Sequence, residues 1–227
     1  MKSLASNDRP REIPEASLRR LPIYYRSLQM MMRAGISQVS CADLARALGL
    51  DPTLVRKDIE MTGIVGKPRV GYTLQDLVQW IENFLGWNRP KKAVLVGAGS
   101  LGSALLGYDR FRSHGMEIVA VFDIDREKIG KRIHDRLVQP LMLLPDFITR
   151  EHVPLGLIAV PAAAAQSVAD LMVVGGIRAI WNFAPAHVRV PARIILQNED
   201  LYHSLASLSF KLENVPPENG IIYAEDN

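Results

Sequence analysis

The stretch Val94–Phe111, "VLVGAGSLGSALLGYDRF", places a short apolar run before a glycine turn and a helical pattern. Its glycines Gly97, Gly99 and Gly102 have the G-x-G-x-x-G spacing that opens a dinucleotide-binding unit. The first glycine of that motif allows the tight turn, the second lets the backbone approach a pyrophosphate, and the third lets helix and strand pack closely. The first amides of the helix then face the phosphates. We therefore expect a strand, a turn and a helix with a nucleotide bound at the turn.

The sequence that follows extends this unit to a Rossmann domain. From Ala93 onward apolar runs alternate with helical patterns, which is typical of a parallel sheet covered on both faces. Asp123 ends the second expected strand, where a carboxylate can accept hydrogen bonds from an adenosine ribose. It would also repel a 2′-phosphate, an effect that Arg126 could partly offset, so we expect NADH and NAD+ as ligands. Because ligands bind at the carboxyl ends of such strands, the expected cofactor-binding residues are Gly97, Gly99, Ser100, Leu101, Gly102, Asp123, Val160, Pro161, Ala162 and Phe183.

The later loops at these strand ends lack the groups that catalysis needs. "VPAAAAQ" and "NFAPAHV" offer alanine, proline and Phe183, and His187 is the only nearby candidate for proton transfer. The 135 residues from Ala93 onward fit one Rossmann domain, without the substrate domain that dehydrogenases usually carry. We expect a pocket that binds without reacting, and no catalytic residue. A small NAD-dependent oxidoreductase and a CoA- or nucleotide-binding scaffold remain as alternatives.

Helical patterns precede this domain. An apolar stripe begins at Pro14, with Pro22 expected to mark a helix start within it and Gly35 its end. In "SCADLARALGL" two polar residues have capping-box-like spacing, and "DPTLVRKDIEMTG" begins with an N-cap aspartate and a proline. Only about three residues separate these two patterns, which is the tight joint of a helix-turn-helix whose second helix enters the major groove.

The third helix and the sequence after it predict a DNA-binding surface. The helix is expected to expose Thr53, Arg56, Lys57 and Glu60, and "IVGKPRVGYTL" indicates a β-hairpin wing. Thr73 and Asp76 are then expected to cap a fourth helix that ends at Gly86. The expected DNA-binding residues are Arg56, Lys57, Lys67 and Arg69. The alternative is a small helical domain whose basic residues only keep its surface hydrated.

Charge and composition agree with a nucleic-acid partner. Before Pro90 there are 13 Lys and Arg against 9 Asp and Glu, whereas after it there are 14 against 15. No segment has the unbroken apolar length of a membrane span, and the N-terminus lacks the apolar core of a signal peptide, so we expect a cytoplasmic protein. Cys41 is the single cysteine and the five histidines lack metal-ligand spacing, so we expect neither a disulfide nor a metal.

Several stretches resemble the bacterial Rex family of redox-sensing transcriptional repressors. They are "LRRLPIYYRSL", "LVRKDIEMTGIVGKPRVGY", "LVGAGSLGSALLGY", "IVAVFDID", "VPAAAAQSVADLMVVGGI", "NFAP" and "DLYHSLASLSFKL", and they span nearly all of residues 13 to 213. The resemblance implies an α/β fold with an N-terminal winged-helix domain, a Rossmann NAD(H)-binding domain and a swapped C-terminal helix. It implies a homodimer that binds AT-rich pseudopalindromic operator DNA and releases it when NADH binds. It further implies that Arg26, Tyr108 and Asp200 couple the two ligands.

The sequence patterns and the resemblance together divide the chain into segments. We expect tails at residues 1–12 and 215–227, a winged-helix domain at 13–86 and a linker at 87–92. A Rossmann domain at 93–198 and a dimerisation helix at 199–214 complete the division. The sequence departs from the family at Leu54 and at Glu60-Met61-Thr62, where the family usually has glutamine and a small polar residue followed by two aromatics. These departures leave the operator sequence open, but not the DNA-binding role.

Overall fold

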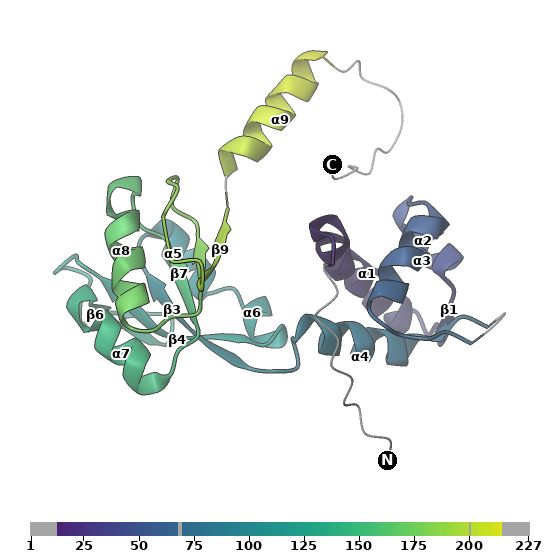
Figure 1. The fold of residues 1–227 in the computed structure, drawn as a ribbon, viewed down its shortest axis with the longest axis horizontal. Helices are drawn as coiled ribbons and strands as arrows, with labels where there is room; N and C mark the ends of the chain where they lie inside the picture. Colours follow the sequence, from purple (N-terminus) through teal and green to yellow (C-terminus); the bar gives the residue numbers. More distant parts are fainter. Residues whose placement is uncertain (1–12, 68–69, 200, 215–227) are drawn as a thin grey trace. The chain divides into compact units, whose positions relative to one another are not determined.

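The computed structural model describes residues 13–67, 70–199 and 201–214, and these divide into two compact units (Figure 1). Among the described residues the first unit ends at Gly86 and the second begins at Trp87. The first unit contains α1 (Glu15–Arg33), β1 (Gln38–Val39), α2 (Cys41–Leu48), α3 (Pro52–Met61), β2 (Tyr72–Thr73) and α4 (Leu74–Leu85).

Helix α1 runs without interruption through Pro22, so the expectation that Pro22 begins a helix is wrong. Proline removes one backbone donor from the helix interior. The burial of neighbouring apolar side chains offsets the cost of the missing hydrogen bond, because Leu21, Tyr24 and Leu28 are completely or almost completely buried. The helix therefore continues through Pro22 for as long as its apolar face is buried.

The helix-turn-helix forms as the capping residues predict. The Ser40 hydroxyl accepts a hydrogen bond from the Asp43 amide at 3.1 Å, and the Asp43 carboxylate accepts one from the Ser40 amide at 3.1 Å. Helix α2 ends at Gly49, whose φ is 68°. Asp51 then caps α3 by accepting from the amides of Thr53 and Leu54. These local contacts set the joint between α2 and α3.

Thr73 does not cap α4 with its side chain, contrary to expectation. It lies in β2, which pairs antiparallel with β1 through Gln38↔Thr73 and Val39↔Tyr72. The amide of Leu74, at the start of α4, donates to the carbonyl of Ser37 at 2.9 Å. The carbonyl of Ser37, the residue just before β1, thus accepts a hydrogen bond at the start of α4, the capping role that we expected of the Thr73 side chain.

The wing segment is only partly a hairpin over the described residues. Lys67 and Gly71 form an isolated bridge, with the Lys67 amide donating to the Gly71 carbonyl at 2.8 Å. Within the described part of the wing the two apolar arms do not pair further, and Val65 is 90% exposed. Arg69 lies outside the described residues. The strand after the tip, β2, pairs with β1 instead. Gly71 lies so close to Val39 that a side chain at position 71 would collide with the Val39 carbonyl oxygen.

The second unit is a seven-stranded sheet with the order β5-β6-β4-β3-β7-β8-β9. All neighbouring pairs are parallel except β5 with β6. From β6 to β9 this is the strand order of a dinucleotide-binding Rossmann fold. The strands are β3 (Lys91–Val96), β4 (Met116–Asp123), β5 (Arg132–Ile133), β6 (Arg136–Pro140), β7 (Leu155–Ile158), β8 (Ala179–Asn182) and β9 (Ile195–Asn198).

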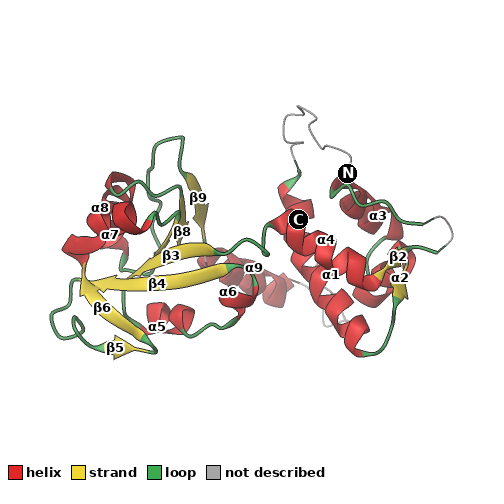
Figure 2. Cartoon of the chain, turned by 90° about the horizontal axis from the view of Figure 1, so that it is seen from below, coloured by secondary structure: helices red, strands yellow, loops and turns green. Residues whose placement is uncertain are grey.

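Helices cover both faces of this sheet (Figure 2). The apolar side chains of its strands divide between two buried clusters, one beneath α7 and α8 and one beneath α5 and α6. The helical elements are α5 (Ser100–Leu106), α6 (Arg110–Ser113), the short 3-10 helix η1 (Leu141–Leu143), α7 (Leu144–Glu151), α8 (Ala162–Val174) and α9 (Leu201–Asn214). None of the helices in the described part of the chain combines the length and apolar character needed to cross a membrane.

Two boundaries differ from expectation. Strand β3 begins at Lys91, two residues before the expected strand, so the expected linker is shorter by those residues. The helix expected after the glycine turn is interrupted at Gly107, and Tyr108 therefore lies between α5 and α6 instead of on a helix. The ring of His134 occupies the space beside Gly107, where a Cβ atom would lie 2.6 Å from it. Glycine, the weakest helix former after proline, ends α5 at this point.

Candidate DNA-binding and dinucleotide-binding sites

The glycine turn has the geometry that a dinucleotide requires. Gly97 has a φ of 103°, and a side chain there would collide with the carbonyl oxygen of Ala159. A Cβ atom on Gly102 would collide with the carbonyl oxygen of Gly97, so the third glycine lets α5 start close to the turn. Around Gly99 there is nothing within 4 Å of such an atom in the described structure. The backbone of Gly99 is therefore open to a ligand.

A cavity of about 330 Å³ lies at the carboxyl ends of β3, β4 and β7. Five predicted residues line it: Gly97, Gly99, Asp123, Val160 and Pro161. Ser100, Leu101 and Gly102 form the first turn of α5, while Ala162 begins α8 and Phe183 follows β8, all outside its lining. The lining that the sequence did not predict includes Ile124, Asp125, Lys128, Leu141 and Ala164.

The Asp123 carboxylate is held mainly by hydrogen bonds from nearby backbone amides. It is 8% exposed, and its carboxylate accepts hydrogen bonds from the amides of Ala98 at 2.8 Å and Asp125 at 2.9 Å. Burial alone would raise the pKa of Asp123, but these amides and the Lys128 ammonium outweigh it and hold that pKa below its usual range. The carboxylate thus stays ionised and fixes the turn to β4.

Asp125 and Lys128 present the more accessible polar atoms of the cavity. The Lys128 Nζ lies 3.4 Å from both Asp123 Oδ2 and Asp125 Oδ2, and the Asp125 side chain is 41% exposed. The sequence had pointed to Arg126 as the nearby cation, but Lys128 is the one beside Asp123. Because Asp125 lies two residues beyond the strand end, only the fold of the loop brings its carboxylate to the cavity.

The exposed face of α3 carries the predicted polar residues. Thr53, Arg56, Lys57 and Glu60 are exposed, whereas Val55, Asp58 and Ile59 are buried. A hollow of about 760 Å³ lies between the end of α3 and the segment up to Tyr72, and both Arg56 and the exposed Lys67 line it. Basic side chains and a helix face are thereby available to a negatively charged ligand.

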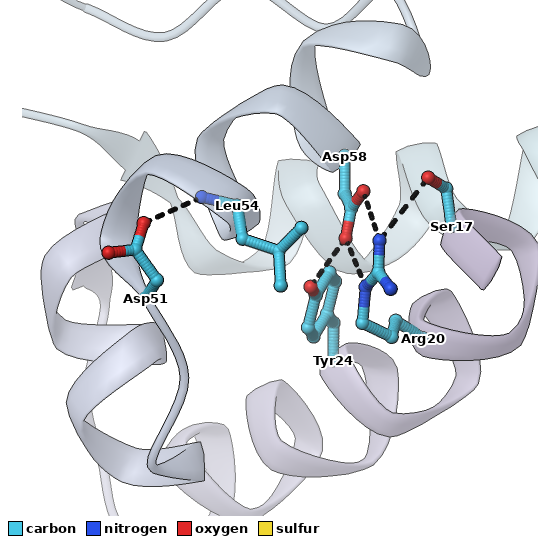
Figure 3. A network of polar contacts seen from close by, with 6 residues as sticks. All are labelled: Ser17, Arg20, Tyr24, Asp51, Leu54 and Asp58. Carbon is cyan, nitrogen blue, oxygen red and sulfur yellow. Dashed lines mark hydrogen bonds and ion pairs between the residues drawn. The ribbon is translucent and has the colours of Figure 1, made fainter. Parts of the chain in front are cut away.

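A buried polar network anchors α3 to α1 (Figure 3). The Arg20 guanidinium donates to both carboxylate oxygens of Asp58, at 2.7 and 2.9 Å, and the Tyr24 hydroxyl donates to Asp58 at 2.6 Å. The Asp58 side chain is 1% exposed. Sequence reasoning missed this network, although an aspartate between Lys57 and Ile59 falls on the buried stripe of the helix. Arg56 and Lys57, the two residues before Asp58, are therefore presented from an anchored helix.

The residues implied in coupling lie in different parts of the chain. Arg26 is exposed on α1 of the first unit, and Tyr108 is 49% exposed in the second unit. Asp200 lies outside the described residues. Cys41 begins α2, and burial raises the pKa of its thiol, which lowers its thiolate fraction. Among the described residues no group of His, Cys, Asp or Glu could hold a metal ion.

Comparisons with known proteins match both units of the chain. Residues 12–59 match the family model described as the N-terminus of putative DNA-binding proteins, and residues 88–186 match the CoA-binding domain model. The fold and the two matches define a regulator with a helical DNA-binding domain and a nucleotide-binding Rossmann domain.

Relatives identify the family. The chain is 46% identical over 201 residues to the redox-sensing transcriptional repressor Rex of Pelotomaculum thermopropionicum, covering 88% of this chain and 94% of that protein. The structure of RSP, a Rex-family repressor, with NAD+ and operator DNA has a TM-score of 0.85 and 32% identity, over 88% of this chain and 93% of RSP. RSP with NADH has a TM-score of 0.80 and 32% identity, over 89% and 95% of the two chains. The chain belongs to the Rex family of redox-sensing transcriptional repressors. These relatives are repressors and not enzymes, which argues against the oxidoreductase alternative.

Proposed function

We propose that this protein is an NADH-responsive repressor that binds a pseudopalindromic operator as a homodimer and releases it when NADH binds. The observation that carries the proposal is the presence, in one Rex-family chain, of a helix-turn-helix with an exposed basic face and an open dinucleotide turn. Because operator DNA and NADH are both found in the bacterial cytoplasm, we expect the protein to act there.

On the DNA side, Arg56 and Lys57 of α3 supply base-edge and phosphate contacts in the major groove. Arginine can bond the edge of guanine with two N–H groups, whereas a lysine ammonium suits a phosphate equally well. Lys67 and Arg69 place the wing against the phosphate backbone or the minor groove. The anchoring of Asp58 to α1 supports this assignment, because a fixed helix presents its side chains in a fixed register.

On the cofactor side, the pyrophosphate lies over Gly99 and the first amides of α5, at Ser100 and Leu101. The ribose of the adenosine binds at the end of β4, where Asp125 complements the carboxylate of Asp123. Val160, Pro161, Ala162 and Phe183 contact the nicotinamide side, because their strands β7 and β8 follow β3 across the sheet. The two carboxylates outnumber the single ammonium of Lys128 beside them, so this end of the cavity disfavours the 2′-phosphate of NADPH.

Dimer formation is assigned to α9. Four of its large apolar side chains are exposed in the single chain, and each is more than half accessible: Leu205, Leu208, Phe210 and Leu212. Such a face needs a partner, and we infer that it packs on a second copy. A chain ending at Glu199 should then sediment as a monomer, whereas the full chain sediments as a dimer.

We assign coupling between the two ligands to Arg26, Tyr108 and Asp200. A carboxylate at position 200 can accept a hydrogen bond from a phenol or from a guanidinium, and a ligand that touches one partner biases that choice. In this proposal Asp200 of one copy exchanges between Tyr108 and Arg26 as NADH enters. If Arg26 is instead only a solvated helix residue and Asp200 only an N-cap, replacing either of them should leave the coupling between NADH and DNA unchanged.

The deciding experiment selects genomic DNA fragments with the purified protein, with and without NADH. We expect enrichment of a shared pseudopalindrome that NADH abolishes and that CoA, added at the same concentration, does not. Selection of no sequence would contradict the repressor function, and loss of binding with CoA alone would favour the nucleotide-scaffold alternative.

A further inference from the structure

Four aromatic rings form a row in the second unit. The centroids of Tyr108 and Phe111 are 4.9 Å apart, those of Phe111 and Trp181 are 5.8 Å apart, and those of Trp181 and Phe183 are 4.8 Å apart. These separations are those of favourable aromatic pairs. The row leads from Phe183, at the carboxyl end of β8, to Tyr108, in the break between α5 and α6.

Trp181 also holds the chain segment that leads into α9. Its indole Nε1 donates to the Glu199 carboxylate at 2.8 Å, and the Glu199 amide donates to the Asn182 carbonyl at 2.8 Å. The side chain of Asn182, which is completely buried, donates to Asn198 Oδ1 at 2.9 Å. Three hydrogen bonds thus hold the segment that leads into α9 against β8. Two of them join side chains and one joins backbone groups.

The indole N–H is the feature that makes this contact directional. A phenylalanine or leucine at position 181 could fill the same space, but neither could donate to Glu199. Phe111, Trp181 and Phe183 are partly buried and pack against the same apolar cluster, so a shift of one ring presses on the next. A displacement of Phe183 is therefore felt by Trp181, and through its N–H by Glu199, which directly precedes Asp200 in the chain.

We propose that Trp181 and Glu199 are positioning residues that set the segment entering α9 according to what occupies the nicotinamide side of the pocket. The inference rests on the proposed function. It adds a route from the cofactor to α9 through Phe183, Trp181 and Glu199, and through Phe111 the same row reaches Tyr108. Trp181 and Glu199 act through other groups and need not touch the cofactor.

The test measures the coupling factor, which is the ratio of the dissociation constants for NADH with and without operator DNA. Trp181→Phe keeps a ring and removes the donor, and Glu199→Ala removes the acceptor. Each should lower the factor roughly two- to tenfold, the range that one net hydrogen bond covers. The double variant should equal the single ones because they remove one shared hydrogen bond.

Two controls separate this role from a general structural one. Glu199→Gln keeps an acceptor oxygen and should keep most of the wild-type factor. Gln197→Ala changes an exposed residue of β9, two positions before Glu199, and should leave the factor unchanged. Thermal unfolding of each variant identifies any that fail to fold.

A second readout follows Trp181 directly. Its indole N–H resonance, identified by its loss in Trp181→Phe, should shift when NADH binds the full-length dimer, whereas that of Trp80 on α4 should not shift in the absence of DNA. An unmoved Trp181 resonance, or wild-type coupling in the Trp181→Phe and Glu199→Ala variants, would overturn the inference alone. A wild-type coupling factor of one would overturn the proposed function and the inference with it.

Discussion

At the scale of single residues, Asp58 shows how a charged side chain can serve the fold next to residues that serve binding. Its carboxylate is buried against Arg20 and Tyr24 on α1, whereas the preceding Arg56 and Lys57 are exposed. Asp58→Ala would leave the Arg20 guanidinium, whose side chain is 14% exposed, without its carboxylate. We expect the free energy of unfolding to fall by about 3 to 5 kcal/mol.

Urea unfolding of the two variants Asp58→Ala and Asp76→Ala checks this prediction. Asp76 is exposed on α4, so its replacement should cost under about 1 kcal/mol. Equal losses in the two variants would mean that the buried ion pair has no special weight.

The same network predicts a pH dependence. Burial alone would raise the pKa of Asp58, but hydrogen bonds from Arg20, Tyr24 and Ser17 outweigh it and lower that pKa. The resulting stability is present above the ordinary aspartate value of about 3.9 and is lost as the pH falls through the lower folded value. The stability of the wild type should therefore drop below about pH 4 more steeply than that of Asp58→Asn.

Gly99 and Gly102 should respond differently to the same substitution. Gly99 has open space around it and an extended backbone, so Gly99→Ala should keep the melting temperature while its methyl group obstructs the pyrophosphate. Gly102→Ala would collide with the Gly97 carbonyl and should lower both stability and NADH affinity. Calorimetry and thermal unfolding on the two proteins check this. Unchanged NADH affinity in Gly99→Ala would place the phosphates elsewhere.

At the scale of elements, α3 should carry most of the operator affinity. Arg56→Ala removes a bond to a base edge and should cost about 1 to 3 kcal/mol at one operator position, whereas Lys57→Ala removes a bond to a phosphate and should weaken all sequences alike. Titration at several salt concentrations separates the two, because removing one bond to a phosphate lowers the salt slope by about one. Arg19→Ala and Arg46→Ala, exposed on α1 and α2, are matched controls. An unchanged affinity of the Arg56→Ala, Lys57→Ala double variant would exclude α3 as the reader.

Local signals predicted these elements where the decisive contacts are local. Capping residues such as Ser40 and Asp51 bond within three residues of themselves, so the helix-turn-helix could be read directly. The pairing of β2 with β1 joins residues more than thirty positions apart, and no short motif encodes it. The same holds for the residues that line the cavity. The glycine turn was predicted from its local motif, whereas Lys128 and Leu141 line the cavity only because the loops after β4 and β6 fold back to it.

At the scale of the whole molecule, regulation requires that NADH distinguish two states of the protein. A ligand that binds both states equally shifts nothing, however tight its binding. A nearly complete change from DNA-bound to released protein requires a preference on the order of 5 kcal/mol. For the protein to sense redox state, NADH and NAD+ must in addition differ in how tightly they bind, and the two cofactors differ only at the nicotinamide ring.

The residues expected at this ring predict which redox form binds more tightly. Val160, Pro161, Ala162 and Phe183 offer no side-chain charge, and the ring of NAD+ carries a positive charge that would lose its water there without a partner. The neutral ring of NADH avoids this loss. We therefore expect NADH to bind at least about tenfold more tightly than NAD+, which a difference of about 1.4 kcal/mol produces. Calorimetry with both forms measures the ratio, and Phe183→Glu, which places a carboxylate beside the ring, should reduce it by favouring the cation. Equal affinities in the wild type would remove redox discrimination and leave a regulator that reports total dinucleotide.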